Sequence, residues 1–515
     1  MRSSHRSPNA LLPALGSLLL ACGGPSDATG TTEADATQTD SDAASSTGEP
    51  DTGGASTGET TGAPACDGAW SQGGAIATPT LPPGDPEAGR VALLTEDYVS
   101  CGIPWNLFAI AGGALGDDTP LPGREGKNAL VGHGWNVIEL GDGSELVVSN
   151  CLQCHAGEFN GELILGLGKA NHDATGELEA ALGTLGDLPE TTEANAAFNK
   201  FKARILSLSE HSTMKTVGAN PAIMYALSLL AHRDPDTLAW NDEPSYALDP
   251  ERLLPSDPPP WWRASKKASH FANGMSRGDH RGTMILASSL CTDTVAEAEE
   301  LLDYFRDIQA YLETLEAPPY PFAIDEALAA EGEVVFECAC AGCHGTYDAD
   351  PAAESYPNLI IPVDVIGTDP QFATYAGEGG AYHFLETWFN ESFYGGVSTV
   401  VTSDPAPGYT APPLDGVWAT APYFHNGSVP SIELVLNSAA RPTYWRRVDY
   451  DSTNFDESAL GWPWEATASQ AETAQSQRKY VYDTTIFGYA NTGHTFGDEL
   501  DEHERAAVLE YLKTL

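Results

Sequence analysis

Two pentapeptides, CLQCH at residues 151–155 and CAGCH at residues 340–344, share the pattern Cys-x-x-Cys-His. Two cysteines three positions apart can each form a thioether with one vinyl group of a haem, and the histidine that follows can bind the iron. In a chain of 515 residues with 9 cysteines and 13 histidines, roughly 0.004 such patterns are expected by chance. The two copies predict two covalently bound haem c groups. The predicted attachment residues are Cys151, Cys154 and His155 in the first copy, and Cys340, Cys343 and His344 in the second.

Two other kinds of site use paired cysteines, and they are the alternatives to haem attachment. A structural zinc site needs a closed set of four ligands, and neither pentapeptide supplies more than three. A thioredoxin-like redox pair does not require a histidine directly after the second cysteine, and here that histidine is present in both copies. Haem attachment is the reading that uses every residue of both copies.

The helical context of the second motif predicts a mainly α-helical fold. Residues 324–339 carry apolar side chains at helical spacing, with Gly332 where a close helix crossing would need a small residue. The last 18 residues repeat that spacing behind an acidic first turn. In a cytochrome c domain the first and last helices cross, so we expect two cytochrome c-like haem domains with extensive loops; two unrelated amphipathic helices are the alternative.

The N-terminal 65 residues are expected to lie outside this fold. Residues 1–22 combine Arg2 and Arg6 with an apolar stretch too short to span a bilayer, and they end in LLAC, which resembles the lipobox of bacterial lipoproteins. Residues 23–65 lack Lys, Arg and aromatic residues, which predicts a disordered tether. We therefore expect export and a lipid anchor in the bacterial outer membrane, facing the periplasm or the cell surface; an ordinary cleaved signal is the alternative.

The remaining chain is expected to form two domains, residues 66–293 and residues 294–515. A long helical pattern at residues 294–316 is halted by prolines 318, 319 and 321, and the boundary is placed near it. Outside the motifs, Cys66, Cys101, Cys291 and Cys338 are enough for two disulfides in an oxidising compartment. The pairing stays open, and Cys338, two residues before Cys340, could also be unpaired.

The charge balance narrows the choice of partners. The chain has 25 Lys plus Arg against 73 Asp plus Glu, a formal charge of −48, so its surface repels phosphates and anionic headgroups. We expect no nucleic-acid partner and no membrane contact beyond the lipid anchor. A small redox donor or a hydrophobic polymer is the expected partner, and the sequence leaves the oligomeric state open.

The second axial ligand of each iron decides between electron transfer and chemistry. No methionine follows Met284, so a His/Met second haem is disfavoured. Its histidine candidates are His383, His425, His494 and His503, of which His494, in a glycine-flanked loop before the last helix, is the predicted ligand, whereas His503 is expected to be solvated. For the first haem, His172 is the candidate, and an open sixth position that binds dioxygen or peroxide is the alternative.

Several longer segments carry a family resemblance over roughly residues 95–515. The two motifs, AYLETLEAPPYPFAIDEAL and APPLDGVWATAPYFHNGSVPSIELVL resemble the bacterial di-haem cytochrome c peroxidase superfamily. Within it, GIPWNLF, PPPWWRASKK and HFANGMSRGDHRG look most like the rubber oxygenase branch, which cleaves polyisoprene with dioxygen.

The resemblance implies roles for further residues. The position that matches the peroxidase methionine ligand is Ala439, and the place of the tryptophan between the haems is taken by Ala272. Both departures favour the rubber oxygenase branch. This branch implies a bis-histidine second haem whose second ligand is His494, while His425 lies near that haem without binding its iron. Trp262 or Trp261 would then pass electrons.

The same resemblance suggests how the first haem is surrounded and adds a calcium ion. Phe271, beside His270, would cap its dioxygen face, although core packing is the alternative for every one of these aromatic residues. Arg277, Asp279, His280 and Arg281 are expected to be a solvated cluster. Thr420 and Pro422 match a tripeptide that binds calcium between the domains, but its asparagine ligand has no secure match.

Three functions remain open at this stage. The first is a haem-dependent oxidoreductase of the oxygenase type, with dioxygen activated at the N-terminal haem and electrons handled by the second. The second is a di-haem cytochrome c peroxidase, and the third is a cytochrome that carries electrons without a substrate, or a surface haem protein that serves as a partner or sensor.

Overall fold

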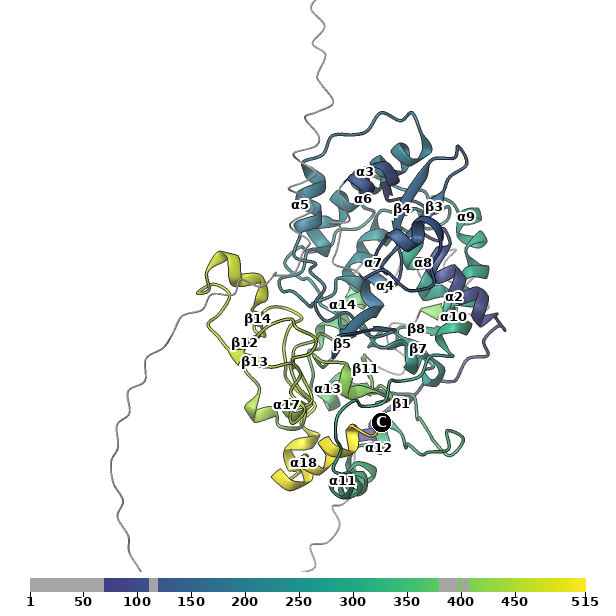
Figure 1. Cartoon of the computed structure of the whole chain (residues 1–515). Helices are drawn as coiled ribbons and strands as arrows, with labels where there is room; N and C mark the ends of the chain where they lie inside the picture. Colours follow the sequence, from purple (N-terminus) through teal and green to yellow (C-terminus); the bar gives the residue numbers. More distant parts are fainter. Residues whose placement is uncertain (1–68, 111–118, 379–397, 401–406) are drawn as a thin grey trace, which may run out of the picture.

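The computed structural model describes residues 69–110, 119–378, 398–400 and 407–515 (Figure 1). Of the described residues, 38% are helical and 13% are in strands. The expected signal and tether, Cys66 and His383 lie outside the described residues. The mainly α-helical class and the two cytochrome c-like domains stay predictions, and the packing below is the observation that bears on them.

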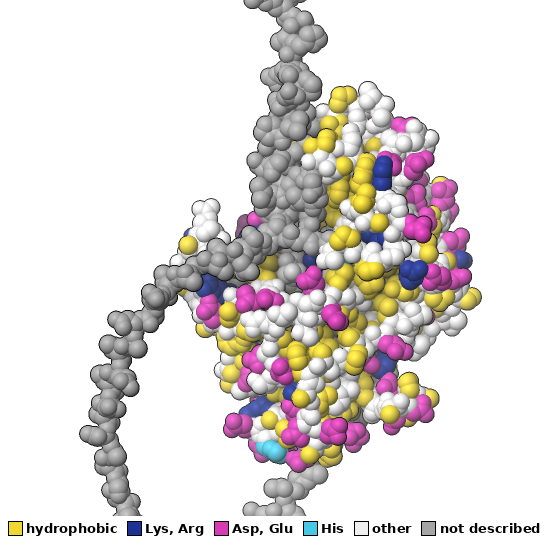
Figure 2. All heavy atoms as spheres, viewed as in Figure 1, with side chains coloured by type: hydrophobic (Ala, Val, Ile, Leu, Met, Phe, Trp, Pro, Cys, Tyr) yellow, Lys and Arg dark blue, Asp and Glu magenta, His cyan; other side chains and the backbone are white. Residues whose placement is uncertain are grey.

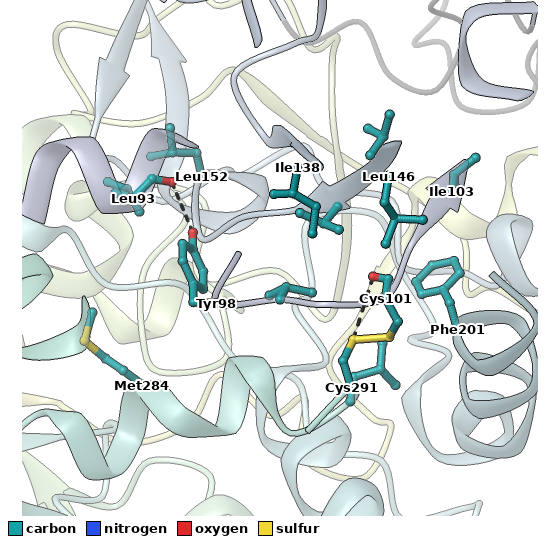
Figure 3. Packing of buried hydrophobic residues seen from close by; sticks show 14 of the residues in the cluster. Leu93, Tyr98, Cys101, Ile103, Ile138, Leu146, Leu152, Phe201, Met284 and Cys291 are labelled. Carbon is teal, nitrogen blue, oxygen red and sulfur yellow. Dashed lines mark hydrogen bonds between the residues drawn. A yellow bond between two sulfur atoms is a disulfide. The ribbon is translucent and has the colours of Figure 1, made fainter. Parts of the chain in front are cut away.

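A core of buried side chains from residues 92–312 forms the first half of the molecule. At its edge α2 (Pro86–Thr95) crosses α10 (Leu302–Leu312), and a Cβ on Gly89 would lie 1.9 Å from the carbonyl oxygen of Asp307. The hydroxyl of Tyr98 donates to the carbonyl of Leu93 inside this core (Figure 3). The other helices of this half are α3 (Trp105–Ile110), α4 (Leu152–His155), α5 (Glu177–Gly183), α6 (Glu193–Ser212), α7 (Ala222–Ala231), α8 (Arg281–Ser288) and α9 (Val295–Glu300).

The second half repeats this crossing of two helices. In it α11 (Glu326–Ala339) packs across α18 (Glu502–Leu512), and a Cβ on Gly332 would lie 1.9 Å from the carbonyl oxygen of Ala507. A capping box between Asp501 and Glu504 starts α18. The predicted crossing at Gly332 is confirmed. The other helices here are α12 (Ala341–His344), α13 (Val363–Ile366), α14 (Gln371–Glu378) and α17 (Ile432–Leu436).

Short strands form small sheets around these helices. The longest ladder pairs β3 (Trp135–Glu139) with β4 (Glu145–Ser149), and β2 (Ile103–Pro104) adds to its edge. The others are β5 (Ala156–Phe159) with β6 (Glu162–Leu165); β1 (Gly74–Ala75), β9 (Leu359–Pro362) and β11 (Gly408–Thr410); β7 (Ser269–His270), β8 (Ser276–Gly278) and β10 (Ser398–Val400); and β12 (Tyr444–Arg447), β13 (Trp464–Ala466) and β14 (Tyr482–Asp483).

A third core joins the two halves. Its buried side chains come from residues 214–254 and from residues 372–489. The helix expected over residues 294–316 is interrupted at Leu301, where α9 gives way to α10. Because α10 packs with the first core, the change of core falls after Leu312, and the boundary at residues 293/294 stays a prediction.

Cys101 and Cys291 form a disulfide across 190 residues of sequence (Figure 3). Cys338 is also disulfide-bonded, so the alternative that left it unpaired is wrong. We expect a Cys101→Ser/Cys291→Ser variant to lose about 2–5 kcal/mol of unfolding free energy, because the bridge restrains a long loop in the unfolded chain. Denaturant unfolding at pH 7 measures this loss, and an unchanged midpoint would contradict it.

Acidic side chains are spread over the face seen in Figure 2, with few Lys and Arg between them. Among the helices of the described residues, none is long and apolar enough to cross a bilayer.

Candidate haem sites

Both Cys-x-x-Cys-His motifs fold into the same single helical turn. In α4 the amides of Cys154 and His155 donate to the carbonyl of Cys151, at 3.3 and 3.2 Å. In α12 the amides of Cys343 and His344 donate to the carbonyl of Cys340, at 3.1 and 3.0 Å. All four cysteines of the motifs are free thiols. The two copies therefore present two thiols and an imidazole in equivalent backbone geometry.

Burial keeps these groups neutral. Desolvation raises the pKa of the Cys151 and Cys343 thiols to about 11 and that of Cys340 to about 12. Desolvation also lowers the pKa of His155 to about 4 and lowers that of His344. A neutral imidazole is the form that binds a metal ion. Both histidines are thus in the protonation state that haem iron requires.

Each motif histidine faces the carbonyl of a proline. The Nδ1 atom of His344 lies 2.8 Å from the Pro412 carbonyl oxygen. The Nδ1 atom of His155 is buried and has no hydrogen-bond partner within the described residues, while the nearby Pro259 carbonyl acts to raise its pKa against the larger effect of burial. A proton held on Nδ1 leaves Nε2 free to bind a metal, as in histidine ligands generally. The prolines of PPPWW and APPLDG thus have parallel places in the two halves.

A cavity of about 120 Å³ lies beside the second motif. His344 lines it, together with Tyr347, Tyr356 and Lys266. This space is smaller than a haem, and His494 does not line it. What fits a haem c at this motif is the donor set itself: two thiols and an imidazole whose Nδ1 is already satisfied.

The segments around Pro259 and Pro412 are linked to each other by hydrogen bonds. The ring of Trp261 stacks on His155, with ring centres 4.7 Å apart and planes 21° apart. The next residue, Trp262, donates from Nε1 to the carbonyl of Asp415 at 2.8 Å, and Arg263 donates from Nε to the same oxygen at 2.9 Å. Asp415 follows Pro412 by three positions. A continuous path of packed and bonded groups therefore runs from His155 to His344.

The predicted second ligand, His494, lies opposite His344. Their ring centres are 6.2 Å apart, with planes 53° apart. With a metal–nitrogen bond of about 2 Å and about 1.1 Å from a ring nitrogen to the ring centre, two imidazoles on opposite sides of one ion have centres about 6 Å apart. Burial, and next the charge of His344, lowers the pKa of His494 to about 3, and its Nδ1 atom has no hydrogen-bond partner. The separation is the one that a shared iron would require.

The other histidine candidates of the second half lie elsewhere. His425 stacks on Tyr409, with ring centres 4.0 Å apart, and burial lowers its pKa to about 3. His503 is exposed and pairs with Glu331 at 2.8 Å, which confirms that it is solvated. His494 thus remains the predicted ligand.

Near the first motif, the structure brings together two histidines. His270 and His280 lie with ring centres 4.0 Å apart, and the Nδ1 atom of His280 is 2.9 Å from the Nε2 atom of His270. Burial is the main reason why the pKa of each of these two histidines is lowered, and it brings that of His280 to about 4. His155 is close enough to lower the pKa of His280 further. His172 lies in the loop after β6, whose Lys169 amide donates to the carbonyl of Cys154. Its role as sixth ligand stays a prediction.

The expectation of a solvated cluster at residues 277–281 is wrong. Asp279 is fully buried, and its carboxylate accepts from the Nε and Nη2 atoms of Arg281. The adjacent segment holds Phe271, half-buried, in the left-handed region at φ 61°. Such backbone conformations are costly for a bulky residue and cluster at functional sites, which agrees with a defined place for Phe271 but leaves its role a prediction.

The calcium site suggested for Thr420 and Pro422 meets an unfavourable charge. The adjacent cavity is lined by Ala419, Ala421 and the Arg447 guanidinium, with Glu158 as its acidic member. A buried cation next to a dication is repulsive. Among the described residues, no group of three or more His, Cys, Asp or Glu side chains is placed to hold a metal ion by itself.

Comparison with known proteins agrees with a cytochrome. Residues 408–446, which include Pro412, Asp415 and His425, match a family model described as RoxA-like, cytochrome c-like. The match supports the rubber oxygenase-like branch of cytochromes and indicates a haem-dependent redox protein that binds haem c.

Two relatives come from Sinorhizobium fredii, the uncharacterized proteins y4iM and y4iJ. The chain is 29% identical to y4iM over 36% of its own length and 44% of the relative's. It is 30% identical to y4iJ over 45% of its own length and 47% of the length of y4iJ. The chain therefore spans about half the length of these relatives.

Proposed function

We propose that this protein is an exported di-haem c-type cytochrome of the rubber oxygenase-like kind, an enzyme that reacts with dioxygen at its N-terminal haem. The observation that carries the proposal is the pair of similar Cys-x-x-Cys-His turns. In the second of them, the ring centre of the motif histidine, His344, lies 6.2 Å from the ring centre of His494. A second iron held by His344 and His494 has no position left for a substrate. Chemistry is then assigned to the first haem.

The residues around the two motifs divide the work. Haem iron supplies the reaction with dioxygen or peroxide and the exchange of electrons. His155 and His344 hold the irons, and the four thiols fix the two groups covalently. Trp261 and Trp262 connect the histidines through the Asp415 carbonyl. Phe271 and His270 are assigned to the open side of the first haem, where they exclude water and orient the substrate.

Export to an oxidising compartment is part of the proposal. The Cys101–Cys291 disulfide and the oxidised Cys338 support it, because disulfides persist outside the cytoplasm. The anchor to an outer membrane rests on residues 1–22, outside the described residues.

Two reactions of such an enzyme differ in their electron balance. An oxygenase that cleaves a carbon–carbon double bond places one atom of dioxygen on each carbon, which gives two carbonyl groups and consumes no electrons from a donor. A peroxidase takes two electrons and two protons from outside for each hydrogen peroxide reduced to two water molecules. The departures at Ala439 and Ala272 favour the first reaction.

The test supplies purified holoprotein with polyisoprene and air, without a reductant or peroxide. We expect carbonyl-ended fragments, detected by mass spectrometry. Turnover of a reduced cytochrome only when peroxide is added would replace the oxygenase by a peroxidase. Two purely low-spin haems without any response to dioxygen or peroxide would leave an electron carrier.

A further inference from the structure

Arg441 makes five hydrogen bonds to backbone carbonyls, and three of them are around His494. Its Nη1 atom donates to the carbonyls of Asn491 at 2.8 Å and Gly493 at 2.7 Å, and its Nη2 atom donates to the carbonyl of His494 at 3.2 Å. Its other donors reach the helix α17, with Nε to the carbonyl of Leu434 at 2.8 Å and Nη2 to that of Val435 at 3.0 Å. One guanidinium therefore ties the loop before α18 to α17.

The loop needs such a restraint. His494 has φ 46°, in the left-handed region that only a few non-glycine residues adopt. The preceding residue, Gly493, lies so close to the chain that a Cβ would be 2.0 Å from the carbonyl carbon of Gly367. The amide of His494 donates to the carbonyl of Ile366 at 2.7 Å. The imidazole is thus placed by backbone contacts on both sides, and Arg441 supplies three of them.

The Arg441 side chain also touches the ligand through Phe424. Its guanidinium lies 4.9 Å from the centre of the Phe424 ring, and that ring lies 6.0 Å from the ring of His494. Arg441, Phe424 and His494 are therefore packed in one cluster.

The charge of Arg441 is not neutralised by an ion pair within the described residues. The five bonds above all end on neutral carbonyls, and Asp498, the carboxylate that acts on Arg441, is exposed and bonded to Ser438. A cation so close to His494 acts on the iron that this histidine would bind. Since ferric iron carries one more positive charge than ferrous iron, the cation favours the ferrous state.

We infer that Arg441 is the positioning residue of the second haem: it holds His494 on the iron and raises the reduction potential of that haem. The inference rests on the proposed ligation by His344 and His494. Neither role requires Arg441 to touch the iron or the substrate.

The test compares Arg441→Gln and Arg441→Lys in the holoprotein, with Arg447→Gln as a matched control. Arg447 is another half-buried arginine of this half, 4.2 Å from the centre of the Trp462 ring, and burial lowers its pKa to about 10, as it does that of Arg441. Absorption and electron paramagnetic resonance spectra give the spin state, and spectroelectrochemical titration gives the potential of each haem.

For Arg441→Gln we expect part of the second haem to become high-spin and added imidazole to restore the low-spin form. In the presence of imidazole, its ferrous-to-ferric ratio at a fixed potential should fall about tenfold, which is about 59 mV for one electron. Arg441→Lys keeps the charge and loses the planar fork. The Arg441→Lys variant should therefore lose part of its low-spin haem, but in the presence of imidazole its ferrous-to-ferric ratio should stay close to that of the wild type. Arg447→Gln should change neither quantity.

A wild-type spin state and potential in Arg441→Gln would overturn the inference. If that variant does not fold, Arg441→Lys decides, because fully low-spin haem in it overturns the positioning role. A wild-type protein without any low-spin haem, or a His494→Ala variant in which no haem changes from low spin to high spin, instead refutes the proposed ligation itself.

Discussion

Replacing His494 by alanine is expected to convert one of the two haems from low spin to high spin, while both haems stay attached. The reason is geometric, because His494 is the imidazole that faces His344, with ring centres 6.2 Å apart. Without it the sixth position is open or filled by water, which is a weaker ligand. Absorption and electron paramagnetic resonance spectra measure the change, and alkaline pyridine treatment counts the haems.

Two matched variants control for the loss of any histidine from the C-terminal half. His503→Ala removes an exposed ring that pairs with Glu331 and should leave the spectrum unchanged. His425→Ala removes a buried ring stacked on Tyr409, so it should lower stability without changing the spin state. If His494→Ala is spectrally silent and His425→Ala is not, the ligand is His425; silence in both transfers the assignment to His383.

The sequence was informative where function depends on local spacing. The two pentapeptides fold into helical turns with the same hydrogen bonds, because the spacing of the thiols and the imidazole is set within five residues. The crossing of α11 and α18 was also predictable, since an apolar stripe and a glycine at the contact carry that information. A glycine-flanked loop just before the last helix predicts that His494 can reach a haem, and in the structure its ring centre lies 6.2 Å from that of His344.

Contacts between distant segments were not predictable from these patterns. Asp279 was expected in solvent because its neighbours are charged, but the tertiary fold buries it with Arg281. His280 was expected in solvent as well, and no role was expected for Arg441, since nothing in their local sequence tells which carbonyls or rings they meet. The hairpin of β3 and β4 could have been found, because Asp142-Gly143 between two apolar runs is a strong turn signal.

The helix crossing itself yields the second large effect, expected for Gly332→Ala. A Cβ at this position would lie 1.9 Å from the carbonyl oxygen of Ala507 and 2.4 Å from its carbonyl carbon. Because the obstacle is backbone, no side chain can rotate away, and α11 and α18 must separate. We expect a loss of ~3 kcal/mol or more of unfolding free energy, at the upper end of overpacking costs.

The consequence reaches the second haem because α11 leads directly into the motif at Cys340. Gly183→Ala is the matched control, since Gly183 ends α5 and the nearest atom to its Cβ would be 3.9 Å away, on the Leu206 side chain. Alanine at this position lowers the conformational entropy of the unfolded chain, so the substitution should leave the unfolding free energy unchanged or raise it slightly. Thermal unfolding followed at the haem absorption of each variant measures the difference. Equal midpoints for the two alanine variants would mean that the helices do not cross as closely as Gly332 requires.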